Sequence, residues 1–128
     1  MRVKFRKIKN PVETRAYVQN VLAHLGISGM NKTIRIKFVS KLDNGKSHGE
    51  CSGDKSVAYI KIATNFNREI QLRTLAHELC HVSQFFKGHL DSELTTWKGH
   101  DFSNAAYDDQ PWEIEAHAIE DFLYKASV

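Results

Sequence analysis

The stretch RTLAHELCHVSQFFKGH, residues 73–89, contains two histidines four positions apart, His77 and His81, with Glu78 directly after the first. Neither glycine nor proline interrupts the chain between about residues 68 and 86, which allows one long helix. Apolar residues recur there at helical spacing: Leu72, Leu75, Ala76, Leu79, Val82 and Phe86. We therefore predict a helix over residues 68–86 and take it as the central element of the fold.

The H-E-x-x-H pattern acquires a chemical meaning once it lies on a helix. Residues four apart lie one above the other, so His77 and His81 direct their rings to one place, within reach of a Zn²⁺ that binds imidazole nitrogen at about 2.0–2.1 Å. Glu78 lies about 100° around the helix from His77, so its carboxylate reaches a water on the metal and is a candidate general base. A shuffled chain of this composition would contain the pattern about twice in a hundred attempts.

A catalytic zinc usually has three protein ligands, so a third must come from outside the motif. The stretch PWEIEAHAIEDF, residues 111–122, starts a predicted last helix at Pro111. Glu115 shares a face of this helix with apolar residues, where an ionised carboxylate is costly unless it has a partner. We therefore favour Glu115 as the third ligand. Glu113 is the alternative, and it lies on a more polar face with His117, Glu120 and Tyr124.

The remaining elements can be placed from their periodicity. Residues 3–8 alternate as a short edge strand, and a helix runs from Pro11 until Gly26 stops it. TIRIKFVS and SVAYIKIAT, residues 33–40 and 56–64, alternate as half-buried strands, and we predict that they pair antiparallel across a turn-rich connection. LTTW, residues 94–97, is predicted to form a short hairpin. The fold class is therefore α+β, a small antiparallel or mixed sheet with about three helices packed on it.

The length and composition of the chain indicate which class of protein it belongs to. With 128 residues, 41% hydrophobic and 26% charged, the chain has the size and balance of one globular domain spanning residues 1–128. It contains no run of eighteen apolar residues and no signal-like N-terminus, so we expect no membrane partner and a cytoplasmic location. Cys51 and Cys80 are the only cysteines, and we predict that both are free thiols in a reducing compartment.

Charge is distributed unevenly along the chain. Residues 1–100 carry 17 Lys and Arg against 8 Asp and Glu, whereas residues 101–128 carry 1 against 7. This favours solvated faces of opposite sign, with a weak contact with nucleic acid through the basic N-terminal region as a second interpretation. The cations that would form this contact arm are Arg2, Lys4, Arg6, Lys7 and Lys9.

The motif and the PWEIEA helix together resemble the zincin superfamily of H-E-x-x-H metallopeptidases, in particular small glutamate-type zincins and SprT-like metallopeptidases of bacteriophages. The resemblance covers roughly residues 57–124. It implies a peptide or protein substrate, a Zn²⁺ cofactor held by His77 and His81, and Glu78 as catalytic base. It also implies that SVAYIKI is the edge strand along which an extended peptide docks, and that the protein works in the host cytoplasm if it is encoded by a phage.

The resemblance also introduces another third ligand. SprT-type proteins take it from a His-Gly pair before a Phe, and the corresponding stretch here is Gly99-His100-Asp101-Phe102. His100 matches this pattern only in part, so Glu115 stays the preferred ligand. His24 and His48 have no metal-like spacing, and His89, only eight residues after His81, is a candidate helix-end residue.

The sequence therefore predicts metal-assisted peptide hydrolysis, in which Glu78 takes a proton from the zinc-activated water and passes it to the leaving amine. Tyr107 or His117 is a candidate to stabilise the oxyanion. The alternative function is a nucleic-acid-associated or interaction module whose zinc site is structural or vestigial.

Overall fold

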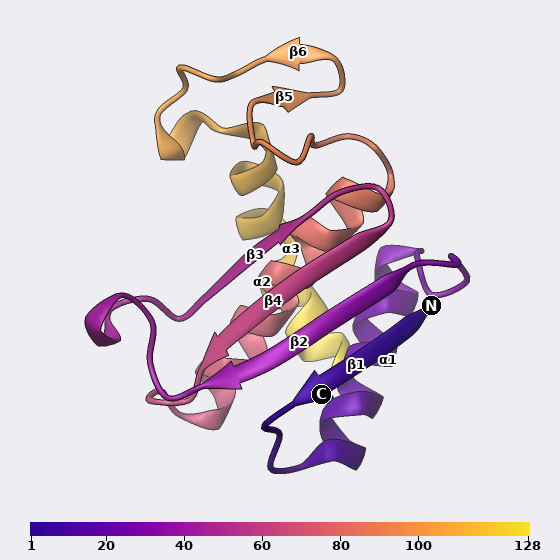
Figure 1. The fold of residues 1–128 in the computed structure, drawn as a ribbon, viewed down its shortest axis with the longest axis vertical. Coiled ribbons are helices and arrows are strands. Elements are labelled where there is room, and N and C mark those ends of the chain that lie inside the picture. Colours follow the sequence, from indigo (N-terminus) through magenta and orange to yellow (C-terminus); the bar gives the residue numbers. More distant parts are fainter.

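A computed structural model describes residues 1–128 as a four-stranded sheet with three helices on one of its faces (Figure 1). A separate two-stranded hairpin and two short 3₁₀ turns complete the chain. The elements are β1 (Arg2–Arg6), α1 (Pro11–Leu25), β2 (Thr33–Val39), η1 (Asp43–Gly45), β3 (Gly49–Gly53), β4 (Val57–Ala63), α2 (Arg68–Phe86), β5 (Thr96–Trp97), β6 (His100–Asp101), η2 (Tyr107–Asp109) and α3 (Pro111–Ser127). The predicted α+β class is confirmed, with a mixed sheet.

The strand order is β1-β2-β4-β3, and β1, β2 and β4 run parallel while β3 runs antiparallel to β4. The predicted antiparallel pairing of the strands in residues 33–40 and 56–64 is therefore wrong. The reason lies in the chain between them, which forms β3 and turns back at Gly53 to pair with β4 as a hairpin. β4 consequently has a neighbour on each side, so the prediction that SVAYIKI is an edge strand is also wrong. β3 occupies that edge.

The helices begin and end where the sequence indicates. Pro11 occupies the first turn of α1, and Gly26 ends it with a φ of 75°, a left-handed conformation that glycine adopts without strain. Asn67 caps α2 by accepting a hydrogen bond from the Ile70 amide at 2.9 Å. Pro111 opens α3. The predicted helix over residues 68–86 is confirmed at both ends.

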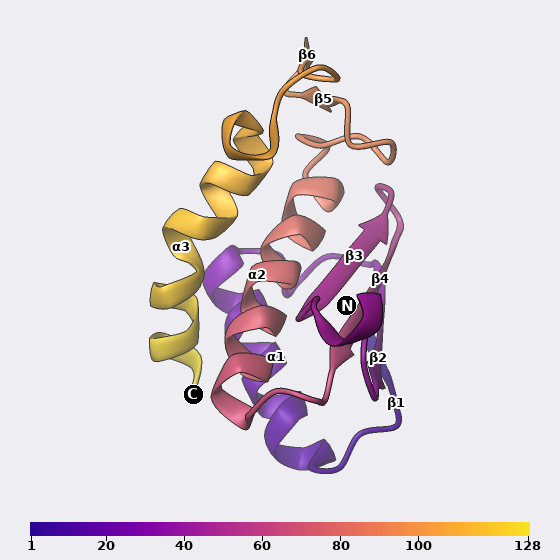
Figure 2. The same ribbon diagram turned by 90° about the vertical axis from the view of Figure 1, so that its left-hand side faces the viewer.

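The helices form two layers behind the sheet (Figure 2). α1 and α2 lie against the sheet, and α3 packs on their far side, so α2 is enclosed between β3, β4 and α3. The apolar faces of these elements merge into one core, which includes Ile34, Ile60, Leu75, Leu79 and Trp112. No helix combines the length and the apolar character that crossing a membrane requires.

β3 can approach α2 closely because its first residue lacks a side chain. A Cβ atom on Gly49 would lie 2.7 Å from Cγ2 of Thr74 on α2, which is too close for two carbon atoms. The glycine therefore allows the edge of the sheet to close one wall of a space that lies above the H-E-x-x-H turn of α2.

The segment between α2 and α3 contains the predicted short hairpin. Thr96 pairs with Asp101 and Trp97 with His100, and a further bridge joins Leu90 to Trp97. This hairpin lies beyond the end of the sheet in both views (Figures 1 and 2). The chain then enters η2, which brings Tyr107 back toward α2 and α3.

Candidate metal centre

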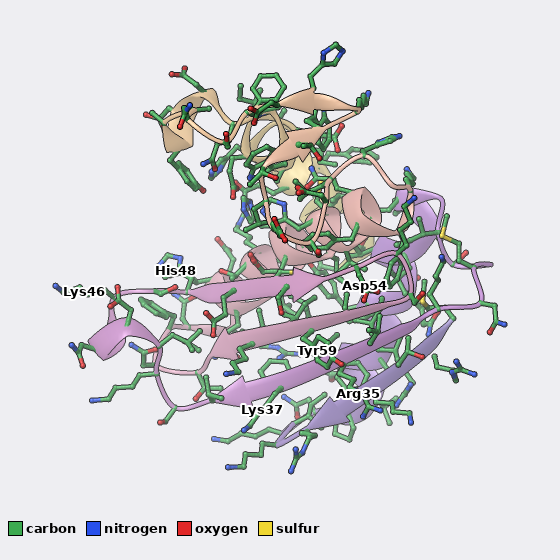
Figure 3. All side chains as sticks on the ribbon, turned by 45° about the horizontal axis from the view of Figure 1, so that its top comes forward. Arg35, Lys37, Lys46, His48, Asp54 and Tyr59 are labelled. Atoms are coloured by element: carbon green, nitrogen blue, oxygen red, sulfur yellow. The ribbon has the colours of Figure 1, made fainter.

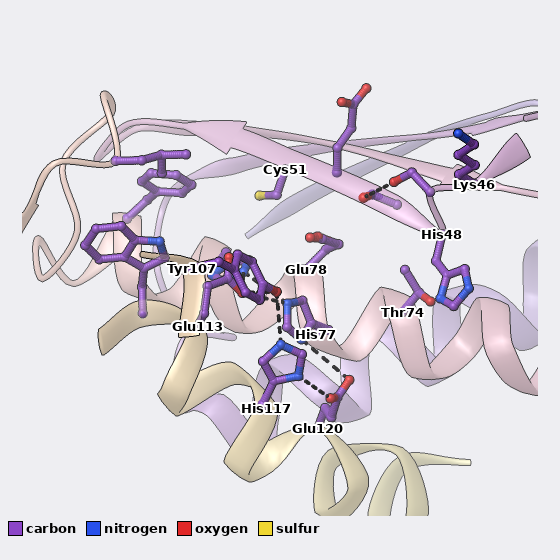
Figure 4. A pocket seen from close by; sticks show the side chains of 17 residues that line it. Lys46, His48, Cys51, Thr74, His77, Glu78, Tyr107, Glu113, His117 and Glu120 are labelled. Atoms are coloured by element: carbon purple, nitrogen blue, oxygen red, sulfur yellow. Dashed lines mark hydrogen bonds and ion pairs between the residues drawn. The ribbon is translucent and has the colours of Figure 1, made fainter. Parts of the chain in front are cut away.

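A cleft of about 500 Å³ opens between α2, α3, η2 and the edge strand β3 (Figure 4). His77 and His81 project into it from α2, and their Nε2 atoms lie 3.2 Å apart. Their side chains are only 13% and 8% exposed. The helical spacing therefore brings both rings to one point, as predicted from the sequence.

Glu113 supplies the third polar group at this point. Its Oε1 atom lies 3.1 Å from Nε2 of His77 and 3.1 Å from Nε2 of His81. Burial alone would raise the pKa of Glu113, but hydrogen bonds and the proximity of the two imidazoles hold that pKa well below its usual range. The carboxylate is thus ionised at neutral pH and faces both histidines.

The spacing of these three atoms fits a zinc ion. Zinc binds such ligands tetrahedrally at about 2.0–2.1 Å, which puts neighbouring ligand atoms about 3.3 Å apart. Two imidazole nitrogens and a carboxylate oxygen 3.1–3.2 Å apart come close to this value. Three acceptor atoms can converge in this way only if a proton or a metal cation lies among them. Glu113 favours a proton at this point, because its hydrogen bond helps to raise the pKa of His81 above its usual value, although burial opposes the change.

Glu115, the ligand that we favoured from the sequence, does not reach the two histidines. Its Oε1 accepts a hydrogen bond from Nε2 of Gln84 at 3.1 Å, and the Trp112 carbonyl accepts another from the same nitrogen at 3.0 Å. Because both neighbours are acceptors, the amide nitrogen of Gln84 must face them, and Oε1 of Gln84 must face His81. The structure therefore places the Glu113 carboxylate in contact with both histidine rings, whereas the Glu115 carboxylate contacts Gln84 instead.

This arrangement also determines the tautomer of His81. Oε1 of Gln84 lies 2.7 Å from Nδ1 of His81 and can only accept, so Nδ1 carries a proton, and in the neutral imidazole Nε2 is the atom that presents its lone pair to the cleft. A metal-binding histidine is normally oriented through its other ring nitrogen in this way. Glu115 thus acts on His81 through Gln84.

Glu78 lies between α2 and β3, on the open side of the histidine pair (Figure 4). Its side chain is buried, with 6% exposure, and its Oε2 atom has no hydrogen-bond partner. Burial raises the pKa of Glu78, while His81 and His77 oppose the increase. Its carboxylate and the ring nitrogens of His77 and His81 all lie within 4.8 Å of one another. A buried carboxylate oxygen without a protein partner is costly, so this oxygen is the group of the cleft that most needs a hydrogen-bond donor or a cation.

Three further residues belong to the site: Glu120 was given no role from the sequence, and Tyr107 and His117 were named only as candidates to stabilise the oxyanion. Oε2 of Glu120 lies 3.5 Å from Nδ1 of His77, and Oε1 of the same carboxylate lies 3.0 Å from Nδ1 of His117. The hydroxyl of Tyr107 lies 3.0 Å from Nε2 of His117 and 3.1 Å from Oε1 of Glu113. The available signal was the spacing of Glu113, His117 and Glu120 on one face of α3, a face that we interpreted as solvated.

The other candidate histidine lies elsewhere. His100 is exposed in β6, opposite Trp97, and does not line the cleft.

Both cysteines are free, as predicted. Cys51 lines the cleft from β3, and burial raises the pKa of Cys80 to about 12, so its thiol is protonated at neutral pH.

The geometry therefore supports a site of two histidines and one glutamate that could hold a divalent metal, with a second glutamate facing the open side. Comparisons of the chain with protein-family models, with curated proteins and with solved structures find no match.

Proposed function

We propose that this protein is a zinc-dependent metallopeptidase with a zincin-like fold. In this proposal His77, His81 and Glu113 hold the zinc, and Glu78 is the catalytic base. The observation that carries it is the convergence of three ligand atoms 3.1–3.2 Å apart beside the unpartnered, buried carboxylate of Glu78. Two ligands and the base are those predicted from the sequence, and the third is the alternative that the sequence ranked second.

Zinc bound at this point would lower the pKa of a water toward about 7 and polarise a peptide carbonyl. Glu78 would take a proton from that water as the water oxygen adds to the carbonyl carbon, and it would deliver the proton to the amine nitrogen when the C–N bond breaks. The buried position of Glu78 favours this second step, because burial raises its pKa and so stabilises the protonated form.

Tyr107 is suited to stabilise negative charge on the substrate carbonyl. Its hydroxyl lies 3.1 Å from Oε1 of Glu113, next to the metal position. Burial and the nearby carboxylate of Glu113 raise the pKa of Tyr107 well above its usual value, so the hydroxyl keeps its proton at neutral pH. It has one proton to donate and two acceptors nearby, Glu113 and His117. With the Glu113 carboxylate holding zinc, this hydroxyl would be placed to donate to a substrate oxygen.

β3, and not β4, is the strand that an extended peptide can reach. This strand is the edge of the sheet and lines the cleft through Gly49, Glu50 and Cys51. An edge strand has free backbone groups that can pair with an extended peptide. We therefore expect the substrate to align along β3, not along β4.

The open side of the cleft argues against a purely structural zinc site. Structural zinc usually has four protein ligands, whereas a catalytic site keeps one position open. Here three ligand atoms converge, and the fourth direction opens into the cleft beside Glu78. This difference favours the enzyme over the alternative of a module with structural zinc.

Zinc content and peptide cleavage test the proposal together. The purified wild-type protein should contain about one zinc per chain by elemental analysis, and Glu113→Ala should lose it while Glu115→Ala keeps it. Glu78→Gln should keep zinc and lose cleavage of casein or of a peptide library. Full activity in Glu78→Gln would refute the mechanism, and loss of zinc from Glu115→Ala but not from Glu113→Ala would reassign the third ligand.

A further inference from the structure

The face of the sheet that points away from the helices is uncovered (Figures 2 and 3). Alternate residues of the four strands point to this side, and most of the charged ones are cationic. They comprise Arg2, Lys4 and Arg6 on β1, Arg35 and Lys37 on β2, and Lys61 on β4. Glu50 on β3 is the only acidic residue among these outward positions, and it lies 3.9 Å from Lys61. We call this surface the open face.

Strand register arranges all of these charged side chains except Arg2 in two rows across the sheet, and Arg2 lies in a third row with Thr33 and Val57. One row contains Lys4, Arg35, Tyr59 and Ser52, and the other contains Arg6, Lys37, Lys61 and Glu50. Neighbouring strands lie about 4.8 Å apart and same-face residues along a strand about 6.6 Å apart, so the cations form a regular positive field. This field is a property of the sheet pairing, because the residues come from separate parts of the chain.

Tyr59 lies within this field. It belongs to β4, between the row neighbours Arg35 and Ser52, and Figure 3 shows it on the open face beside Arg35 and Lys37. The side chain of Tyr59 is 49% exposed, and its ring forms no aromatic or cation-π pair with the rest of the protein. An aromatic ring in the middle of a sheet of cations is thus free to stack on a planar ligand.

We propose that the open face binds single-stranded nucleic acid, with a base stacked on Tyr59 and the phosphates paired with the surrounding cations. The regular cations complement a polyanion, and the exposed ring complements an unpaired base. A duplex keeps its bases stacked inside and would leave Tyr59 unused. An anionic membrane would call for large apolar side chains that insert, and the outward positions hold no Leu, Ile, Phe or Trp.

This proposal differs from a contact by the N-terminal region alone. Arg2, Lys4 and Arg6 contribute, but β2 and β4 supply the centre of the surface. It also does not depend on the proposed peptidase activity, because the metal site lies on the helical side of the sheet and the open face lies on the other. Binding can therefore be measured with or without zinc.

The direct test is fluorescence anisotropy with a labelled oligothymidylate of about 12 nucleotides, in zinc and in chelator. For single strands, each neutralised phosphate makes the slope of log affinity against log salt concentration more negative by about 0.7. If about four phosphates are paired, affinity should fall about fiftyfold between about 50 and 200 mM salt. The double variant Arg35→Gln/Lys37→Gln should weaken binding about tenfold at about 50 mM salt and reduce the slope by about 1.4.

Substitutions of Tyr59 separate stacking from charge. Tyr59→Ala should weaken binding about tenfold with an unchanged salt slope, whereas Tyr59→Phe should stay within about twofold of the wild type. The matched charge control is Lys98→Gln/Lys125→Gln, which removes two exposed cations away from the open face and should leave affinity nearly unchanged. Thermal unfolding of each variant checks that the fold is retained.

Several outcomes would overturn the proposal. Absence of oligonucleotide binding at about 50 mM salt would remove it, and an equal loss in the control double variant would show only a general charge effect. Tighter binding to a matched duplex, with no effect of Tyr59→Ala, would replace the stacking mode by duplex binding. Binding to phosphatidylserine vesicles without binding to oligonucleotides would assign the face to a membrane surface.

Discussion

The cleft and the open face lie on opposite sides of one sheet, and their charged side chains differ in burial. In the cleft, Glu78, Glu113 and two histidines are mostly buried and face one another within a few ångströms. On the open face the charged side chains are spread in rows and are mainly solvated. Burial makes electrostatic interactions strong and makes unpaired groups costly, whereas solvent and salt weaken those of the open face.

This difference predicts which properties a change of charge should affect in each region. Charges in the cleft should determine stability, metal affinity and chemistry, and each should have an individual role. Charges on the open face should contribute little to stability and should act together on a ligand.

Removal of zinc should have the largest effect on stability. An ion that is present at a thousandfold excess over its dissociation constant stabilises the folded state by about 4 kcal/mol. For a chain of this length, chelation should lower the midpoint of thermal unfolding by roughly 15 °C. Calorimetry with and without chelator measures the difference. Arg35→Gln/Lys37→Gln should show the same shift, and an unchanged midpoint in the wild type would contradict a metal centre.

Glu115→Ala should weaken zinc binding without abolishing it. The substitution removes the only charged one of three acceptors around the Gln84 amide nitrogen, which orients the ring of His81 through its oxygen. Loss of such an outer partner typically costs ten- to a hundredfold in metal affinity. Competition with a chromophoric chelator measures the dissociation constant.

The conservative variant Glu115→Gln separates the hydrogen bond of Glu115 from its negative charge. Glu115→Gln retains an oxygen that accepts from Gln84 and should therefore bind zinc almost as the wild type does. Equal losses in Glu115→Ala and Glu115→Gln would indicate that the negative charge of Glu115, and not its hydrogen bond, supports the site.

Glu78→Gln should stabilise the metal-free protein, although it abolishes activity in our proposal. Removing a buried charge whose Oε2 has no partner should gain about 1–2 kcal/mol at neutral pH. Urea unfolding in chelator measures this gain. Glu50→Gln on the open face is the matched control, since Glu50 is exposed, and its effect should stay within about 0.5 kcal/mol.

The gain from Glu78→Gln should depend on pH. Burial raises the pKa of Glu78 in the folded protein above its ordinary value of 4.5, so the folded state binds this proton more tightly than the unfolded state. The wild type therefore loses stability relative to the variant as the pH rises from about 4.5 through the raised pKa, and the difference is constant above it. A difference that shrinks over this interval would contradict the burial of an unpartnered carboxylate.

Lys61→Gln on the open face should have the smallest effect on folding. Lys61 and Glu50 are 3.9 Å apart and both are more than half exposed. Such surface pairs contribute about 0–1 kcal/mol, so the free energy of unfolding in urea should change by less than about 0.5 kcal/mol. A loss above about 1 kcal/mol would show that the open face contributes to stability and would weaken the contrast with the cleft.

The local features of the site could be predicted from the sequence because they depend on helix geometry alone. The spacing of His77 and His81 places both rings on one side of any α-helix, and the absence of breakers between residues 68 and 86 predicts that helix. The position of Glu78 relative to the pair follows from the same geometry. Pro11, Gly26 and Pro111 likewise mark helix ends through their own backbone preferences.

The choice between Glu113 and Glu115 could not be made in the same way. Two residues apart on a helix means about 200° of rotation, so the two side chains point in nearly opposite directions. Which direction faces α2 depends on how α3 rotates about its own axis when Trp112 and Leu123 pack. We assumed that a carboxylate beside the apolar stripe needs a metal, but Gln84, which belongs to α2, supplies its partner instead.

By itself, the sequence determined the helices, the alternation of the strands and the two-histidine motif with its glutamate, because these depend on neighbours within a few residues. Only the tertiary structure decided the parallel pairing of β2 and β4, the edge position of β3 and the approach of Glu113 to the histidines. It also assembled the open face from the four strands of the sheet. The paired residues of β2 and β4 are 24 positions apart, and Glu113 is 36 and 32 positions from His77 and His81. Such contacts depend on how whole elements pack, which local periodicity does not specify.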